Sequence, residues 1–97
     1  FVVFFDPQRR DDYLRLTRKL RLAGLRVEMY GEPKKIGQQL KYADRRGHRL
    51  ALIAGSDELD QGQCQIKDLN TGDAENISIQ DGYDNLVNAL KKKIADS

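Results

Sequence analysis

The residues best suited to chemistry lie between Lys34 and Gly47. Read at 3.6 residues per turn, this segment has an apolar side formed by Ile36, Leu40 and Ala43, which predicts a helix packed on a core. The other side carries cations, an amide and one aromatic ring: Lys34, Gln38, Lys41, Tyr42 and Arg45. Such groups can bind phosphates and base edges, and an exposed ring can stack on an unpaired base. The alternative is an ordinary surface helix with a solvated basic face.

Residues of the kinds that catalyse reactions are sparse. His48 is the only histidine and Cys64 the only cysteine, so together they supply at most two metal ligands, too few for structural zinc. The acids Asp57, Glu58 and Asp60 could surround a divalent ion, but a turn capped by solvated carboxylates also explains them. The glycines match neither a P-loop nor a dinucleotide fingerprint. The sequence therefore predicts binding without catalysis, and no metal or cofactor in this chain.

The charge is distributed unevenly. Residues 1–49 hold 13 Lys and Arg against 6 Asp and Glu, whereas residues 50–97 hold 4 against 9, which gives +7 and −5. A basic flank suits a polyanion such as nucleic acid, although surface charge that only maintains solubility could also fall this way. A single cysteine fits a reducing, cytosolic setting. No apolar run approaches the ~20 residues that span a bilayer, so no membrane partner is expected.

The elements that must position these residues follow from periodicity and punctuation. Strands are expected at residues 2–5, 25–29, 49–54, 63–69 and 74–79, with residues 70–73 as a hairpin turn. Asp6 and Pro7 can begin a first helix that Gly24 ends, and Pro33 opens the basic helix. Asp81 can cap a final helix with this core stripe: Tyr83, Leu86, Val87, Leu90 and Ile94.

Three strand–helix steps with an inserted hairpin predict an α/β fold: a three-layer α/β/α domain around a mixed five-stranded sheet. The first three strands should be parallel, joined by right-handed crossovers. Ninety-seven residues are enough for one domain, residues 1–97. Because the chain opens at Phe1, inside an expected strand and without an initiator methionine, it is expected to be a piece of a longer protein.

Ligands of such sheets gather beyond the C-terminal ends of the parallel strands. Here that edge also holds the segment from Glu32 to Lys35 and the turn that contains Glu58. Tyr30 or Tyr42 could stack an unpaired base there. Core packing is the alternative for Tyr30, whereas Tyr42 adjoins the polar face and is expected to be exposed.

The order of these motifs resembles the C-terminal anticodon-binding domain of class II aminoacyl-tRNA synthetases, and the histidyl branch most closely. The resemblance covers nearly the whole chain, from the expected strand at residues 2–5 to the last helix. The matching residues are Lys35-Ile-Gly, Gln39, Lys41-Tyr-Ala-Asp44, Gly47, the Gly55–Glu58 turn, and Ile66-Lys-Asp-Leu with Thr71-Gly72. The resemblance implies strand order 2-1-3-4-5, with the fourth strand antiparallel. It also implies that a catalytic core outside these residues uses ATP and Mg²⁺.

The same resemblance implies roles for particular residues and partners. In threonyl-type relatives an acidic residue closes the turn after the third strand and contacts one anticodon base. A basic residue nine positions later contacts another base. Glu58 and Lys67 stand at these two positions. Pro33 stands where that branch has an amide, so a third base contact could pass to Glu32 or Gln38. Lys35, Lys41 and Arg45 are expected on phosphates. The implied partners are the tRNA(His) anticodon stem-loop and the catalytic core, in a cytoplasmic homodimer.

Two other interpretations remain open at this point. One is a non-catalytic relative of the synthetase, either a regulatory paralogue or the uncharged-tRNA sensor of a protein kinase. The other is a small α/β protein-interaction module with no role in RNA binding. Glu58 could also merely cap its turn, and Lys67 could be only an exposed strand residue.

Overall fold

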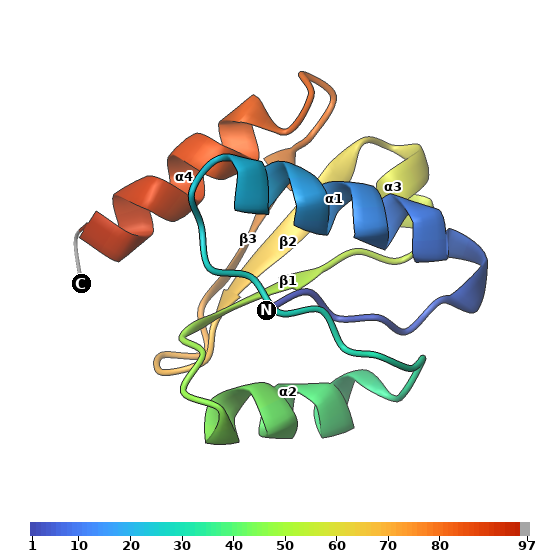
Figure 1. The fold of residues 1–97 in the computed structure, drawn as a ribbon, viewed down its shortest axis with the longest axis vertical. Helices are drawn as coiled ribbons and strands as arrows, with labels where there is room; N and C mark the ends of the chain where they lie inside the picture. Colours follow the sequence, from blue (N-terminus) through green and yellow to red (C-terminus); the bar gives the residue numbers. More distant parts are fainter. Residues whose placement is uncertain (96–97) are drawn as a thin grey trace.

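The computed structural model describes residues 1–95, which form helices packed around a small sheet (Figure 1). A 3₁₀ turn and the first two helices come first, followed by β1, a short helix, a hairpin and the last helix. In order they are η1 (Pro7–Arg9), α1 (Arg10–Leu22), α2 (Ile36–Arg45), β1 (Leu50–Ile53), α3 (Ser56–Asp60), β2 (Gln63–Asp68), β3 (Ala74–Ser78) and α4 (Asp84–Ala95). The chain therefore has the α/β composition that its periodicity predicts.

Three of the expected strands form an antiparallel sheet in the order β1-β2-β3. Leu52 pairs with Ile66, and Cys64 pairs with Ile77, so the hairpin at residues 63–79 is confirmed. The Asp68 carboxylate closes its turn by accepting hydrogen bonds from the backbone amides of Asn70 and Thr71, at 2.8 and 3.2 Å. This Asx-type turn ends the first arm where the sequence indicates it should end.

The predicted five-stranded order is not confirmed, because residues 2–5 and 25–29 form no strands. Val2 makes one parallel bridge to Met29 and one to Leu52, and both ladders stop there. For the ladder to Met29, the reason lies two residues after Val2, at Phe4. The backbone amide and carbonyl of Phe4, which a longer ladder would use, are bonded instead by the side chain of Gln39 from α2.

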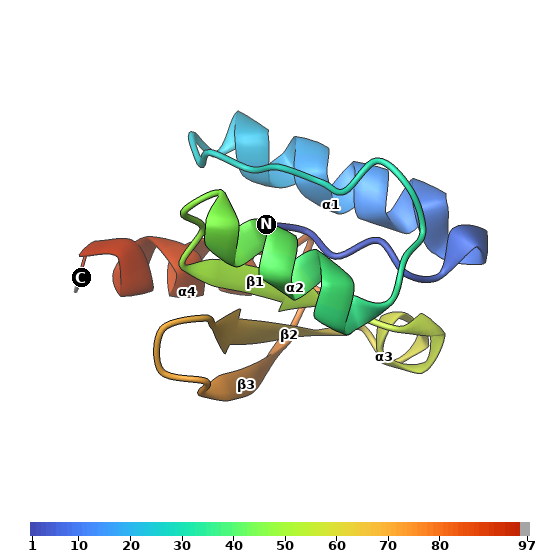
Figure 2. The same cartoon turned by 90° about the horizontal axis from the view of Figure 1, so that it is seen from below.

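The helices lie on two sides of the sheet, as Figures 1 and 2 show. Helices α1 and α4 share one core with the first face, through Tyr13, Leu16 and Leu20 of α1 and Leu86 and Leu90 of α4. Helix α2 covers the second face. Its Ala43 is fully buried in a second core whose buried members also include Phe1, Val3 and Ala51. The predicted three-layer arrangement therefore exists around the smaller sheet.

Several boundaries differ from the sequence-based expectation. Helix α2 begins at Ile36, three residues later than Pro33 predicts, because the intervening backbone follows Phe4 instead, with Lys34 donating to the Phe4 carbonyl. The expected turn after β1 contains the one-and-a-half-turn helix α3. In the predicted stripe of α4, Tyr83 is half-buried and precedes the helix, and Ile94 is 53% exposed. No helix within residues 1–95 has the length and apolar character to cross a bilayer.

Candidate nucleic-acid interface

The basic face of α2 is exposed, as the sequence predicts. Lys35, Gln38, Lys41 and Arg45 are all solvent-exposed, while Gln39 and Ala43 on the opposite side are buried. Within residues 1–95, neither Lys35 nor Lys41 makes an ion pair, and the only bond of Arg45 runs from its Nε to the Lys41 carbonyl at 3.5 Å. These cations are therefore available to an anionic partner.

Tyr42 is half-buried, not exposed, which corrects the expectation for this residue. Its ring lies edge-to-face on Tyr30, with centroids 5.1 Å apart, and 5.9 Å from the ring of Phe1. The Arg46 guanidinium carbon lies 6.0 Å from the centre of the Tyr42 ring. Tyr30 is likewise half-buried, so the core-packing alternative describes it in part. Both tyrosines still line a surface hollow of about 320 Å³, together with Glu32.

A carboxylate at the end of the segment 25–29 organises these rings. Glu28 accepts a hydrogen bond of 2.5 Å from the Tyr42 hydroxyl and lies 2.9 Å from Nε2 of His48 and 3.4 Å from Nε of Arg46. The bonds from Tyr42 and His48 lower the pKa of Glu28 to about 2, since they stabilise its charged form. The hydrogen bond between the Tyr42 hydroxyl and Glu28 also raises the pKa of Tyr42. His48 is therefore a structural partner of Glu28, joined to α2 through it.

The C-terminal edge of the parallel segments brings other predicted residues together around Phe5. A shallow hollow of about 630 Å³ is lined there by Phe5, Pro33, Lys34, Lys35 and Gln38. Gly55 also lies close to this ring: an added methyl group there would stand 3.3 Å from Phe5 Cζ and 3.0 Å from Oε2 of Glu58. Glu58 and the start of α2 are thus both near one half-buried aromatic ring.

Glu58 belongs to helix α3, and contacts from Arg9 hold this helix in place. Arg9, at the end of η1, donates from Nε to the Ser56 hydroxyl at 3.0 Å and from Nη2 to the Ser56 carbonyl at 3.1 Å. It also forms ion pairs with Asp60 and Asp12. Because α3 has only five residues, these contacts restrain an element that would not be stable alone. The Glu58 side chain itself is exposed.

Lys67 is not part of that group. It pairs with Ala51, whose side chain belongs to the core under α2, so Lys67 faces the same side of the sheet as α2. It lies four residues along β2 from Gln63, or roughly 13 Å from the beginning of that strand. Gln65 shares this face and sits between the two positions. The sequence analysis missed Gln65, although the two-residue alternation before Lys67 could have identified it.

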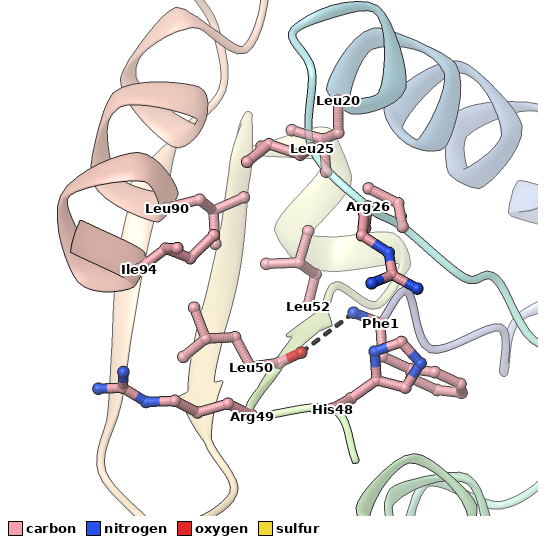
Figure 3. A pocket seen from close by; sticks show the side chains of 11 residues that line it. Phe1, Leu20, Leu25, Arg26, His48, Arg49, Leu50, Leu52, Leu90 and Ile94 are labelled. Atoms are coloured by element: carbon pink, nitrogen blue, oxygen red, sulfur yellow. Dashed lines mark hydrogen bonds between the residues drawn. The ribbon is translucent and has the colours of Figure 1, made fainter. Parts of the chain in front are cut away.

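A separate apolar cavity of about 260 Å³ lies between α1, α4 and β1 (Figure 3). The side chains of Leu20, Leu25, Leu52 and Leu90 converge on it, with Arg26 near one side. None of the residues predicted to bind a ligand lines this cavity. It is adjacent to Leu50, at the beginning of β1, whereas Glu58 follows the end of β1.

Cys64 and His48, of two residue types often used in catalysis, both have packing contacts within the fold. Cys64 is fully buried, and burial raises the pKa of its thiol to about 12, so it is a packed side chain and not a nucleophile. His48 contacts Glu28, and its ring lies 5.5 Å from that of Phe1. The described residues contain no group of three or more His, Cys, Asp or Glu side chains able to hold a metal ion. The arrangement is suited to binding an extended anion.

Curated proteins that resemble the chain are tRNA ligases. The histidine–tRNA ligase of Rhodopirellula baltica is 48% identical over 92 residues, which cover 94% of this chain and 21% of the ligase. That of Bradyrhizobium diazoefficiens is 51% identical over 72 residues, covering 73% of this chain and 14% of the ligase. The chain therefore spans about a fifth or less of the length of these relatives.

Solved structures agree with the sequence matches. The crystal structure of histidyl-tRNA synthetase from Nostoc superposes with a TM-score of 0.85 at 29% identity, covering 96% of this chain and 22% of that one. Apo histidyl-tRNA synthetase from S. aureus superposes with a TM-score of 0.78 at 29% identity, covering 92% and 25%. The family described as "Anticodon binding domain" matches residues 1–93. On this evidence the chain belongs to the anticodon-binding domain family.

Proposed function

We propose that the chain reads the anticodon of tRNA(His) as the anticodon-binding part of a histidine–tRNA ligase. The observation that carries this proposal is the 48% identity to a histidine–tRNA ligase over 94% of the chain. The exposed cations of α2 and the polar groups around Phe5 are consistent with this role. A tRNA held at its anticodon presents its acceptor end at a set distance, which orients the reacting groups elsewhere in the protein.

The proposed contacts divide into phosphate binding and base reading. Lys35, Lys41 and Arg45 bind phosphates of the anticodon stem and loop, because they are exposed and form no ion pair with any residue from 1 to 95. Glu58 reads one base and Lys67 another. A carboxylate accepts from the N1–H and N2–H₂ groups of guanine, and an ammonium donates to a base carbonyl.

The remaining predicted residues line two surface hollows, Gln38 the one at Phe5 and the other three a second one. Glu32 and Gln38 compete for the third base contact, since both are exposed beside Pro33. Tyr30 and Tyr42 offer ring surface in the hollow next to Glu32, where an unpaired base could stack. The roughly 13 Å between Gln63, at the beginning of β2, and Lys67 is consistent with separate bases meeting Glu58 and Lys67.

The chemical step belongs to the rest of such a ligase. A catalytic core in the same protein would use ATP and Mg²⁺ to activate histidine and esterify the tRNA, and this chain would contribute only recognition. We further propose that the full-length protein is a homodimer in the cytoplasm, as the resemblance implies.

We also propose that the segments 25–29 and 2–5 complete the sheet to the order 2-1-3-4-5. The support is the pair of parallel bridges at Val2, one to Met29 and one to Leu52, and the antiparallel direction of β2 relative to β1. Slow amide hydrogen exchange at Val2, Val3 and Leu52 is expected if these bridges persist in solution. Fast exchange at all three amides would limit the sheet to β1, β2 and β3.

The direct test is aminoacylation by the full-length protein. It should charge tRNA(His) with histidine, whereas residues 1–97 alone should catalyse no histidine-dependent pyrophosphate exchange. If the full-length protein binds tRNA but does not charge it, the chain belongs to a regulatory or tRNA-sensing relative. If it binds no tRNA at all, the proposal is wrong.

A further inference from the structure

Gln39 is a polar side chain buried where the helical pattern calls for an apolar one. It is fully inaccessible to solvent, and its amide is saturated by backbone groups of other segments. Oε1 accepts from the Phe4 amide at 2.8 Å. Nε2 donates to the Phe4 carbonyl at 2.5 Å and to the Lys34 carbonyl at 2.9 Å. A buried amide that makes three such bonds is rigidly oriented, because any other orientation leaves polar groups unsatisfied.

The Gln39 amide replaces a neighbouring strand. Val2 donates to the Glu28 carbonyl at 2.8 Å and accepts from the Tyr30 amide at 3.3 Å, which is the pattern of a parallel ladder. Phe4, two residues on, points its amide and carbonyl the same way. There the chain beyond Tyr30 has turned away, and Gln39 bonds both Phe4 groups from α2.

The Gln39 side chain thus lies between Phe4 and Lys34, at the C-terminal end of the ladder. Through Nε2, Gln39 also holds the Lys34 carbonyl, while the Lys34 amide donates to the Phe4 carbonyl at 3.3 Å. The segment 31–35 is therefore attached to the centre of the fold at Lys34, by the Gln39 side chain and by one backbone bond to Phe4. This segment and the first turn of α2 carry Glu32, Lys35 and Gln38.

We infer that Gln39 is the positioning residue for anticodon reading: it sets the place of the segment 31–35 and of Gln38 without touching RNA. The inference rests on the proposed function. If the inference holds, changing Gln39 lowers discrimination between anticodon bases more than an equally destabilising change elsewhere does. The reason is that the buried Gln39 amide helps to place the exposed groups that read the base.

The variants are Gln39→Met and Gln39→Glu in the full-length ligase. Methionine keeps the length of the side chain and removes all three hydrogen bonds, whereas glutamate keeps an acceptor for the Phe4 amide and loses both donors. The matched control is Ile66→Val, a buried change in the other core, between the sheet and α1 and α4, which lowers the melting temperature without contacting the segment 31–35.

The assay compares charging of tRNA(His) with charging of a transcript that differs at one anticodon base. Both Gln39 variants should lose at least about fivefold in this discrimination, through the KM for tRNA, because one base contact is misplaced. Their kcat for histidine-dependent pyrophosphate exchange should not change. The Ile66→Val control should keep the parent's discrimination even if its melting temperature falls by as much as that of the Gln39 variants.

Retained discrimination in folded Gln39→Met and Gln39→Glu proteins would overturn the inference. If both variants misfold, the test is hydrogen exchange at the Phe4 amide of the parent protein. This amide must exchange as slowly as a strand amide. Exchange at the rate of an exposed loop would show that Gln39 does not hold Phe4 in solution. If the parent itself does not discriminate between the two transcripts, the proposed function fails, whatever Gln39 does.

Discussion

Replacing Lys35, Lys41 and Arg45 together with alanine tests whether the basic face of α2 binds RNA phosphates. All three side chains are exposed and none forms an ion pair within residues 1–95. Their removal should therefore change stability little, by about 0.5 kcal/mol or less per site. Arg45 in the last turn favours the helix dipole, whereas Lys35 at the N-cap opposes it, so their dipole effects largely offset each other.

The effect on binding follows from counterion release. Each phosphate contact contributes about 0.7 to 0.9 to the slope of log K against log salt, so three contacts contribute roughly 2 to 3 units. Between 50 and 200 mM salt, a fourfold change, the parent should lose about 20- to 40-fold more affinity than the triple variant. The loss of binding should be similar for cognate and non-cognate tRNA, because phosphates carry no sequence information.

The assay is filter binding of the full-length protein to tRNA(His) at several salt concentrations. The matched control replaces Arg10, Arg18 and Lys19 of α1, which are equally exposed and change the net charge by the same amount on the other side of the sheet. The control should keep most of the parent's slope. An unchanged slope in the α2 variant, or an equal drop in both variants, would show that α2 is only a solvated basic helix.

Three further predictions concern the edge of the sheet and its supports. Glu58→Ala and Lys67→Ala should each lower charging of tRNA with a histidine anticodon more than charging of an anticodon-swapped tRNA, by about 1–3 kcal/mol; equal losses on both substrates would assign them to positioning or folding. Gly55→Ala should leave the melting temperature nearly unchanged but reduce discrimination between the two tRNAs, as Glu58→Ala does. The new methyl group would lie 3.0 Å from the Glu58 carboxylate and must displace it. Retained discrimination in this variant would contradict the prediction. Glu28→Gln should destabilise the protein at neutral pH by about 1.5–3 kcal/mol, since Glu28 is a charged acceptor. Because the folded-state pKa of Glu28 is lowered to about 2, the parent's advantage is fully present above about pH 4.5 and disappears as the pH falls through 2, which urea unfolding at several pH values would measure.

Local signals determined most of the elements. The left-handed glycines after α1 and α2, with φ of +89° at Gly24 and +81° at Gly47, stand where the sequence indicates that helices end. Asp81 accepts a hydrogen bond from the Asn85 amide at 3.1 Å, as expected of a cap for α4. The hairpin follows from alternation and turn residues. These features depend on neighbours within a few positions, which a sequence contains in full.

The exposure of Lys35, Gln38, Lys41, Arg45 and Glu58 could also be predicted, because the polar side of an amphipathic helix and the acids of a capped turn face solvent. Their charge indicates the class of partner. The family resemblance, confirmed over residues 1–93, adds the expectation of an anticodon.

Only the tertiary structure decided which groups meet across the sheet. The sequence indicates an exposed Tyr42 ring on a polar face, but its hydroxyl donates a hydrogen bond to Glu28, 14 positions earlier, and its ring is half-buried against Tyr30 and Phe1. Gln39 reads as one more polar residue in a basic helix. It is buried because the chain leaves the ladder after Tyr30, so that the backbone amide of Phe4, 35 positions away, needs an acceptor that the neighbouring segment no longer provides.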